Sequence, residues 1–286
     1  MKEKRFWCLF LMLSLSISAQ LKGVVVDEKN NPIPFVNIWV EGGNIGTSTE
    51  ENGTFILHTN NENSSLIFNA LGYEKKTILA KDCKKVVLIE LSIELKEVII
   101  SKRLETKQNE IGKNNNPIFE AFPNGPKVDC KFFPFLADYK KTPYIKQVTM
   151  LTDSKIEDAS IKVYLYSVGA DGLPSENLLK KENIVYLKKG VYKHKFDLSD
   201  YNLVMPKNGI FVVFEKLMIE KNKLEKTVID KNNNTQKTER LYYPFLLYDY
   251  VARKEHFIFV GGKWMKEEII DAKNIYEPAI NLVLTN

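Results

Sequence analysis

Histidine and cysteine are scarce in this chain of 286 residues, which contains three of each. The histidines are His58, His194 and His256, and none stands in an HxxE or HExxH arrangement. A zinc hydrolase needs clustered ligands and a general base. The sequence therefore predicts no metal site, and we expect each histidine to lie on the face of a strand.

The cysteines do not form a disulfide framework. Cys8 lies in an apolar run at the N-terminus, so only Cys83 and Cys130 remain in the body of the chain, far apart in sequence. An oxidising compartment permits a bridge between them, whereas isolated cysteines commonly stay as buried thiols. Both states are open from the sequence, and buried free thiols are favoured.

Motifs for nucleophilic, glycosidic or phosphoryl chemistry are also absent. No Gly-x-Ser-x-Gly turn exposes a serine nucleophile, and no glycine-rich loop could cradle a phosphate. Acidic pairs such as Glu157-Asp158 and Glu267-Glu268 are adjacent in the sequence, whereas a glycosidase needs two carboxyl groups facing each other across a cleft. The sequence indicates a non-catalytic protein without a cofactor; an unrecognised hydrolase would need the fold to assemble such groups.

Long apolar runs are missing, apart from a short one near the N-terminus. Basic residues precede the run Phe6–Leu15, and small residues end the segment at Ala19. This order is typical of a secretory signal peptide, and the run is too short to anchor the chain across a bilayer. We expect residues 1–19 to be removed and the mature chain, without a transmembrane segment, to be periplasmic, outer-membrane-associated or secreted.

The net charge does not indicate a polyanionic partner. The formal charge of the whole chain is +5, and the expected signal peptide carries three basic residues and one acidic residue, which leaves +5 − 2 = +3. This small surplus lacks the basic stripe that nucleic-acid binding needs. We therefore expect no nucleic-acid partner.

Short β-branched and aromatic runs, separated by turn residues, fill positions 20–100. Asn52-Gly53 supplies the positive φ angles of a tight hairpin, and Pro34 falls at the edge of a run, where its missing N–H is tolerated. Seven or eight such runs predict a two-sheet Greek-key sandwich. The runs are 24–26, 35–40, 54–58, 66–68, 77–79, 86–91 and 95–100.

Several motifs of this region form a set: GVVVD at 23–27, PIPFVNI at 32–38, GTST at 46–49, NGTF at 52–55, LGY at 71–73 and LKEVII at 95–100. With these motifs the region resembles the carboxypeptidase-D regulatory-like domain family. The resemblance implies a transthyretin-like or Ig-like sandwich, of the type common at the front of exported Bacteroidetes proteins and outer-membrane receptors. It also implies a non-catalytic module, because the catalytic carboxypeptidase domain is a separate one that we do not find here.

A polar segment precedes a second strand-rich region. Residues 101–126 are rich in charge, asparagine and proline, which predicts a linker. Alternating runs in residues 127–286 predict a second, jelly-roll-like antiparallel sandwich, loosely similar to the domains that accompany this front module. Residues 221–239 are expected to form a mobile polar excursion. The expected strands are 145–151, 161–168, 184–187, 191–196, 209–216 and 256–260.

Aromatic side chains of the second region are the candidates for ligand binding. Trp264, Tyr242, Tyr243 and Tyr248 fall close together in sequence, and flat aromatic faces with a hydroxyl suit sugar rings. The alternative is that these rings fill the core of a sandwich. Trp264 has polar neighbours in the Gly261-Gly262-Lys263 turn, which makes it the first candidate for an exposed platform.

Together these features favour an exported, non-catalytic binding protein of the cell envelope that contacts a glycan or another envelope protein. The alternative is a structural or assembly scaffold of the envelope without a small-molecule site. A scaffold predicts an exposed apolar patch or an unpaired sheet edge. A hydrolase is the least favoured hypothesis.

Overall fold

The computed structural model describes residues 20–59, 61–91, 103–113, 120–121, 128–179, 182–229, 235–252, 255–268 and 274–286. The expected signal peptide, the expected strand 95–100 and part of the expected linker lie outside these ranges. Within them the protein is built from strands and a few short 3₁₀ helices, as the all-β prediction requires. None of the described helices has the length and apolarity of a membrane span.

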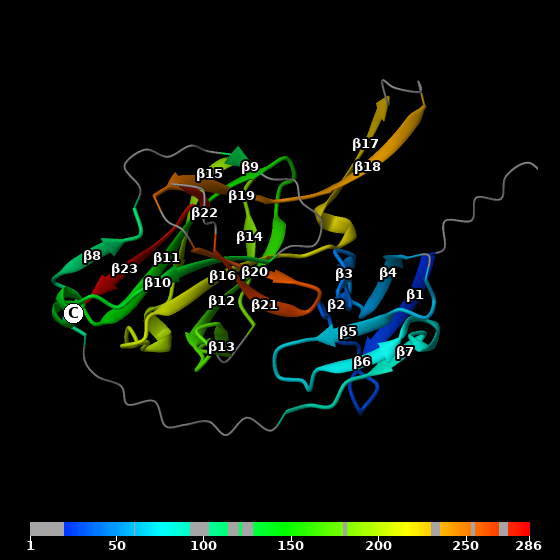
Figure 1. Ribbon diagram of the computed structural model, residues 1–286, viewed down its shortest axis with the longest axis horizontal. Coiled ribbons are helices and arrows are strands. Elements are labelled where there is room, and N and C mark those ends of the chain that lie inside the picture. The colour runs from blue at the N-terminus through cyan, green and yellow to red at the C-terminus, as the bar shows by residue number, and fades with distance from the viewer. Residues whose placement is uncertain are drawn as a thin grey trace, which may run out of the picture.

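The strands form two bodies (Figure 1), which we call the N-terminal sandwich and the second sandwich. The N-terminal sandwich contains β1 (Gln20–Val26), β2 (Asn37–Val40), β3 (Gly46–Ser48), β4 (Thr54–His58), β5 (Ser65–Asn69), β6 (Lys76–Leu79), η2 (Ala80–Asp82) and β7 (Lys85–Val87). The second sandwich begins with β8 (Gln108–Ile111), β9 (Glu120–Ala121), β10 (Val128–Phe133), η3 (Ala137–Lys141), β11 (Tyr144–Ser154), β12 (Ala159–Val168), β13 (Pro174–Asn177) and β14 (Ile184–Leu187). It continues with β15 (Gly190–Asp197), η4 (Ser199–Tyr201), β16 (Ile210–Lys216), η5 (Glu220–Asn222), β17 (Lys223–Ile229), β18 (Gln236–Tyr242), β19 (Phe245–Val251), β20 (Glu255–Val260), β21 (Lys263–Glu268), β22 (Ile275–Pro278) and β23 (Ile280–Thr285).

The N-terminal sandwich packs a three-stranded sheet, β4-β1-β7, on a four-stranded sheet, β3-β2-β5-β6. Strand β1 pairs antiparallel with β4 and parallel with β7. The alternation predicted for β4 is confirmed, because Phe55 and Leu57 are buried while Ile56 is exposed. Gly53, with φ of 74°, turns the chain into β4. The core between the two sheets includes Val25, Ile38, Leu66, Phe68, Val86 and Leu88.

The second sandwich packs two larger sheets. One sheet has the order β13-β12-β16-β10-β20-β21, with β14 also paired to β12; the other has the order β22-β19-β11-β23-β8, with β15 paired to β11 and β9 to β19. Strand β8 falls inside the predicted linker and pairs antiparallel with β23. The two sheets share a core that includes Val148, Met150, Ile161, Val163, Val212, Phe214, Ile280 and Leu282.

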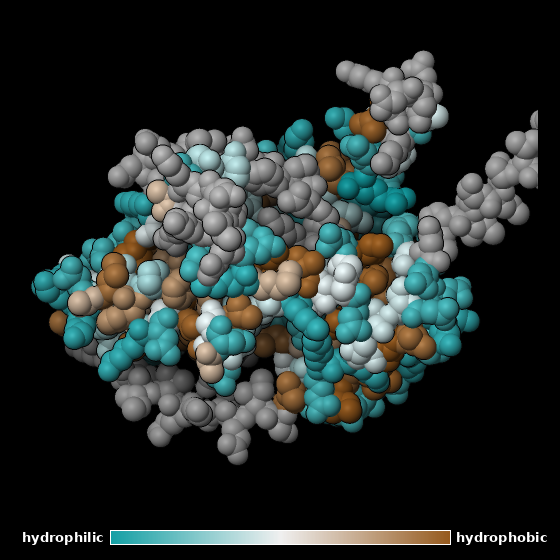
Figure 2. Space-filling model, viewed as in Figure 1, coloured by the Kyte–Doolittle hydropathy of each residue, from teal (hydrophilic) through white to brown (hydrophobic). Residues whose placement is uncertain are grey.

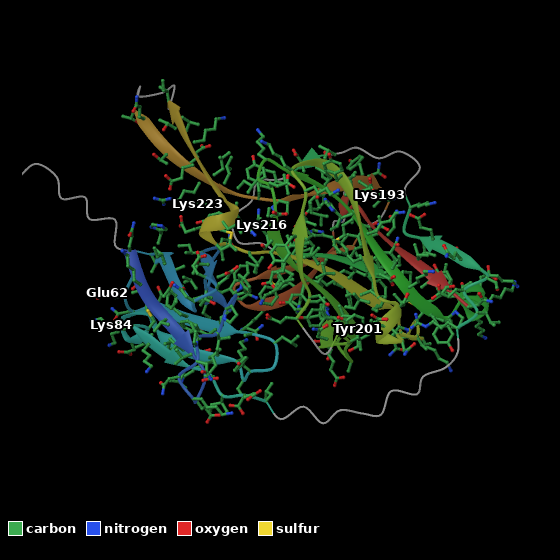
Figure 3. All side chains as sticks on the ribbon, turned by 180° about the vertical axis from the view of Figure 1, so that it is seen from behind. Glu62, Lys84, Lys193, Tyr201, Lys216 and Lys223 are labelled. Carbon is green, nitrogen blue, oxygen red and sulfur yellow. The ribbon has the colours of Figure 1, made fainter. Side chains whose placement is uncertain are left out.

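The described part of the stretch 221–239, expected as a polar excursion, forms a projecting hairpin with strands that the sequence did not predict. Its mobility stays a prediction. Strands β17 and β18 pair in a two-stranded sheet that projects from the body (Figure 3, with Lys223 labelled at its base). The run Thr227–Ile229 is rich in β-branched residues, which suit a pleated strand. Opposite charges also face each other across the pair, with Arg240 Nε 3.2 Å from Glu225 Oε1.

The two sandwiches pack against each other along one face of the β2–β5 pair. Ile38 and its inward-facing neighbours fill the N-terminal core, so Trp39 and Ile67 face the opposite way. Both side chains are buried in a cluster with residues of the large sheet of the second sandwich, namely Val128, Cys130, Tyr164, Phe211 and Val213. This sheet is therefore covered on both faces, which explains why β12 and β16 are almost continuously buried.

Hydrogen bonds cross the same junction. Lys162 Nζ donates to the carbonyl of Phe35 at 2.6 Å, and the Met218 amide donates to Ser48 Oγ at 3.2 Å. The Glu220 amide donates to Glu50 Oε1 at 2.8 Å. The junction thus combines buried apolar side chains with hydrogen-bonded polar groups, and together they fix the position of one sandwich relative to the other.

Cys83 and Cys130 are buried free thiols, as the favoured alternative predicts. Cys83 belongs to the core of the N-terminal sandwich, and Cys130 belongs to the junction. Burial raises the pKa of both thiols. Such thiols are protonated at neutral pH and behave as small apolar side chains.

A glycine substitution tests the junction. Gly261 has φ of +58°, and a Cβ there would lie 2.8 Å from the backbone of Gly42 in the other sandwich. Gly172 has φ of +79° with open space around its Cβ position, so it provides a matched control. We expect Gly261→Ala to cost about 1–3 kcal/mol more unfolding free energy than Gly172→Ala, because only Gly261 has a neighbour to displace. Equal losses in urea denaturation would show that the contact with Gly42 is unimportant.

Candidate functional site

The four aromatic residues predicted as a platform do not lie together. Trp264 is near the start of β21 and Tyr242 ends β18; both are half-buried, and they line different cavities. Tyr243 and Tyr248 are only 2% and 5% exposed. As placed, neither of these two rings presents a face to a ligand.

Tyr243 and Tyr248 correspond to the core-filling alternative. The ring of Tyr243 packs 4.5 Å from that of Phe245, measured between centroids. The hydroxyl of Tyr248 donates a hydrogen bond to Asp129, and burial raises the pKa of this tyrosine well above its usual value. Both side chains thus support the second sandwich.

Trp264 is positioned by a tight hairpin. Val260 pairs with Lys263, and Gly261 and Gly262 form the two-residue connection with φ of 58° and 82°. Two positive φ angles are required by the hairpin turn that matches the twist of the strands. The predicted turn is confirmed, and it places the Trp264 side chain where the two sandwiches meet.

A cavity of about 370 Å³ opens beside Trp264, between the N-terminal sandwich and the large sheet of the second sandwich. We call it the junction cavity. Figure 2 shows a hollow between the two bodies on this face. The lining residues are Asn37, Trp39, Ile67, Asn69, Ala70, Leu71, Gly72, Tyr73, Lys75 and Leu91 from the N-terminal sandwich, and Val128, Tyr164, Tyr166, Pro174, Ser175, Asn177, Val213, Glu215, Phe259, Gly262 and Trp264 from the second sandwich.

Aromatic rings from both sandwiches line this cavity. The Trp39 ring meets that of Phe259 edge-on at 5.4 Å, and Phe259 meets Trp264 at 5.0 Å. The chain of rings continues from Trp264 to Tyr166 at 6.2 Å and to Tyr164 beyond it. Burial raises the pKa of both tyrosines, so their hydroxyl groups stay protonated at neutral pH. Trp264, Phe259 and Tyr166 are half-buried and leave apolar surface to the cavity, whereas Trp39 and Tyr164 are almost fully buried.

A carboxyl group lies among these rings. Glu215 is 5% exposed, and burial raises its pKa above the usual range of a glutamic acid. Three neighbours act in the opposite direction: the charge of Lys162 and hydrogen bonds from Tyr164 and Asn37. Lys162 is directly opposite Glu215 in the pairing of β12 with β16. Because Asn37 belongs to the N-terminal sandwich, Glu215 is held by both sandwiches.

The amide side chains supply the rest of the polar lining. Asn69 and Asn177 stand on opposite walls, one from each sandwich, and Asn37 lies near the floor. An amide offers both a donor and an acceptor, but the Asn177 amide already donates to the Leu179 carbonyl and accepts from the Leu179 N–H. The exposed Asn69 is therefore the amide better placed to meet a neutral ligand with hydroxyl groups.

The sequence predicted Trp264 but missed the other main lining residues. One signal was available for Trp39: in the run 35–40, Val36 and Ile38 alternate as core residues, which assigns Asn37 and Trp39 to the opposite face. A tryptophan on the outer face of a strand indicates a contact surface. Glu215 had no comparable signal, because its role depends on the pairing of two distant strands.

Another polar cluster lies in the second sandwich. Lys131 Nζ lies 3.0 Å from Glu277 Oε2 and donates to the carbonyl of Gly112 at 2.9 Å. Lys131 and Glu277 are buried and line a second cavity of about 280 Å³. His256 Nε2 lies 3.0 Å from Glu267 on the neighbouring strand. The histidines lie on β4, β15 and β20, as predicted. Across the described ranges, no group of three histidine, cysteine or acidic residues could hold a metal ion.

Comparison with known families agrees with the N-terminal resemblance. Residues 21–101 match the model of the CarboxypepD_reg-like domain, and the predicted domain is thereby confirmed. The family is a regulatory, non-catalytic module, typical of extracellular or periplasmic proteins. No curated protein matches the chain in sequence.

Solved structures give only distant likenesses. The chain is similar to the structure of infectious bursal disease virus, Gx strain, with 8% identity, 93% coverage of this chain and a TM-score of 0.21. It is similar to the D431N mutant VP2 protein of the same virus, with 10% identity, 93% coverage and a TM-score of 0.23. The chain spans 60% of the length of each of these proteins.

Proposed function

We propose that this protein is an exported, non-catalytic binding protein of the cell envelope, and that its junction cavity takes a carbohydrate. The observation that carries the proposal is the cavity itself, which combines aromatic faces from both sandwiches with amide and carboxyl groups. Aromatic faces pack on the apolar side of a sugar ring, and polar side chains orient its hydroxyl groups. The regulatory type of the N-terminal module supports a binding role.

The dimensions and lining suit a small ligand. The volume of about 370 Å³ lies within the range of small-molecule sites, which are mostly apolar with a few placed polar groups. Its walls come from two packed bodies, so they are already in place before a ligand arrives. A pre-organised cavity loses little conformational entropy on binding.

The same lining argues for binding over hydrolysis. Glu215 is the one carboxyl group among the described residues that line the junction cavity. Glycoside hydrolysis uses two carboxyl groups placed on either side of the scissile bond. A single acid that is held by Asn37, Tyr164 and Lys162 fits a structural and recognition role.

A glycan-array screen tests the proposal. The mature chain, residues 20–286, should bind a defined set of saccharides, and Trp264→Ala should weaken binding at least about tenfold, because a stacking face is lost. Tyr250→Ala is the matched control, since Tyr250 is an exposed aromatic residue that does not line the cavity. The Tyr250→Ala variant should bind the same saccharides with the affinity of the wild-type protein. Absence of saccharide binding by the folded wild-type protein would contradict the proposal.

A protein partner is the second candidate, and the β17–β18 hairpin favours it. Its two strands pair with no other strand in the part of the chain that the structure describes. Leu224 and Ile229 are exposed on it. Replacing residues 224–241 by a short glycine-serine turn should abolish capture of an envelope protein in a pull-down from envelope extract. Unchanged capture would exclude the hairpin as the contact.

A further inference from the structure

Charge is unevenly distributed around the junction cavity. Among the described residues that line it, Glu215 and Lys75 are the two with acidic or basic side chains. Lys75 is exposed at the rim, on the segment that follows Tyr73, whereas Glu215 is almost fully buried at the floor. A ligand inside the cavity therefore meets a carboxyl group at the floor, and the one basic side chain among the described lining residues stands at the rim.

The nearby lysine is not available to a ligand. Lys162 Nζ is completely buried, donates to the carbonyl of Phe35 and forms an ion pair with Glu182. It does not line the junction cavity. Its charge lowers the pKa of Glu215 from the opposite position on the neighbouring strand. The donors of Asn37 and Tyr164 are likewise directed to Glu215. An anionic group of a ligand would find these partners already engaged.

We propose that the junction cavity selects uncharged saccharides over acidic ones, and that Glu215 is the residue that determines this selectivity. The inference rests on the proposed carbohydrate binding. A uronic acid would bring a carboxylate into a low-polarity space that already holds a carboxyl group. It would lose hydration without gaining a cationic partner, and such a buried, unpaired charge is strongly disfavoured. A neutral sugar avoids this cost, because its hydroxyl groups need only neutral partners such as Asn69, Tyr166 and Ser175 of the lining.

The test uses two oligosaccharides that differ only at C6 of one residue, with a hydroxymethyl group in one and a carboxylate in the other. Calorimetric titration of residues 20–286 should give at least about tenfold tighter binding of the neutral member. In Glu215→Gln the preference should fall below about threefold, since the glutamine carbonyl still accepts hydrogen bonds but carries no charge. A second variant, Ser175→Lys, places a cation on the exposed part of the cavity wall. It should strengthen binding of the acidic member several-fold while Glu215 is untouched.

Two results would overturn the inference while carbohydrate binding itself stands. One is wild-type binding of the acidic member within about threefold of the neutral member. The other is an unchanged preference in a folded Glu215→Gln variant. If neither saccharide class binds the wild-type protein, the proposed function itself fails, and the selectivity with it. The neutral member thus reports on the function, and the difference between the two members reports on Glu215.

Discussion

Replacing Lys162 by methionine is expected to lower the free energy of unfolding by about 3–5 kcal/mol, because it removes the fully buried cation of a charge cluster. The ammonium group faces Glu215 across the β12–β16 pair, bonds to Glu182 and donates to the Phe35 carbonyl. Methionine fills a similar volume, so the loss reports on charge and hydrogen bonding more than on packing. Urea denaturation of residues 20–286 measures it.

The defect should depend on pH with a defined sign. Burial raises the pKa of Glu215 in the folded protein, and the charge of Lys162 partly opposes this rise. Without Lys162 the pKa of Glu215 is raised further. An acid with a raised folded-state pKa stabilises the protein below its unfolded pKa and loses that contribution as the pH rises through the folded value. The deficit of Lys162→Met should therefore be larger at neutral pH than under mildly acidic conditions.

A double-mutant cycle separates the charge effect from other losses. Lys162→Met combined with Glu215→Leu removes the uncompensated acid together with its partner, so the double variant should be more stable than the single Lys162→Met variant. Additive losses, with no dependence on pH, would contradict a coupled pair. In that case Lys162 would act only through Phe35 and Glu182.

Replacing Trp39 by alanine has the second large expected effect. Trp39 is 5% exposed and packs against Ile67 and Phe259 at the junction. Removing a buried tryptophan typically costs about 3–5 kcal/mol. Here the loss is concentrated at the contact between the two sandwiches, so we expect two separate unfolding transitions in place of one. Saccharide binding should be lost as well, because a wall of the cavity is gone.

Trp39→Phe is the matched control, since it keeps a ring at the junction and should retain one transition. Limited proteolysis gives an independent measurement: the chain should be cleaved faster in Trp39→Ala than in wild type, because a loosened junction exposes backbone that is protected while the two sandwiches are packed. If Trp39→Ala unfolds in a single transition, with a free energy of unfolding within about 1 kcal/mol of the wild-type value, Trp39 does not hold the two sandwiches together.

Many turns and strands of this fold can be predicted from local sequence patterns. Gly53 and Gly261-Gly262 lie at turns with positive φ, and the period-two alternation of Thr54–His58 matches its burial. The hairpin predicted at Asn52-Gly53 was wrong, because β3 and β4 on either side of this turn pair in different sheets. Local rules reach this far because a turn or a strand face depends on neighbouring residues only. These local rules did not predict the strands in the polar stretch 221–239, because those strands are stabilised by cross-strand pairs such as Glu225–Arg240.

The cavity depends on contacts that no local pattern encodes. Lys162 and Glu215 each interrupt an otherwise apolar run, and each taken alone suggests a strand end or an exposed position. Only the register of β12 against β16 makes them a buried pair. The packing of the N-terminal sandwich then adds Asn37 and closes the cavity. Trp264 could be nominated from its polar turn, and Trp39 from its place on the outer face of its strand, whereas Glu215 could not be found without the pairing of β12 with β16.

Tryptophan fluorescence offers the most direct test of the central claim, that the junction cavity is the binding site. The chain has three tryptophans, at positions 7, 39 and 264. The first lies in the expected signal peptide, so the mature protein retains two, and both line the junction cavity. Titration with a neutral saccharide chosen on the array should produce a saturable change in emission, with the same dissociation constant as calorimetry. Calorimetric binding without any change in emission would place the ligand elsewhere and contradict the account.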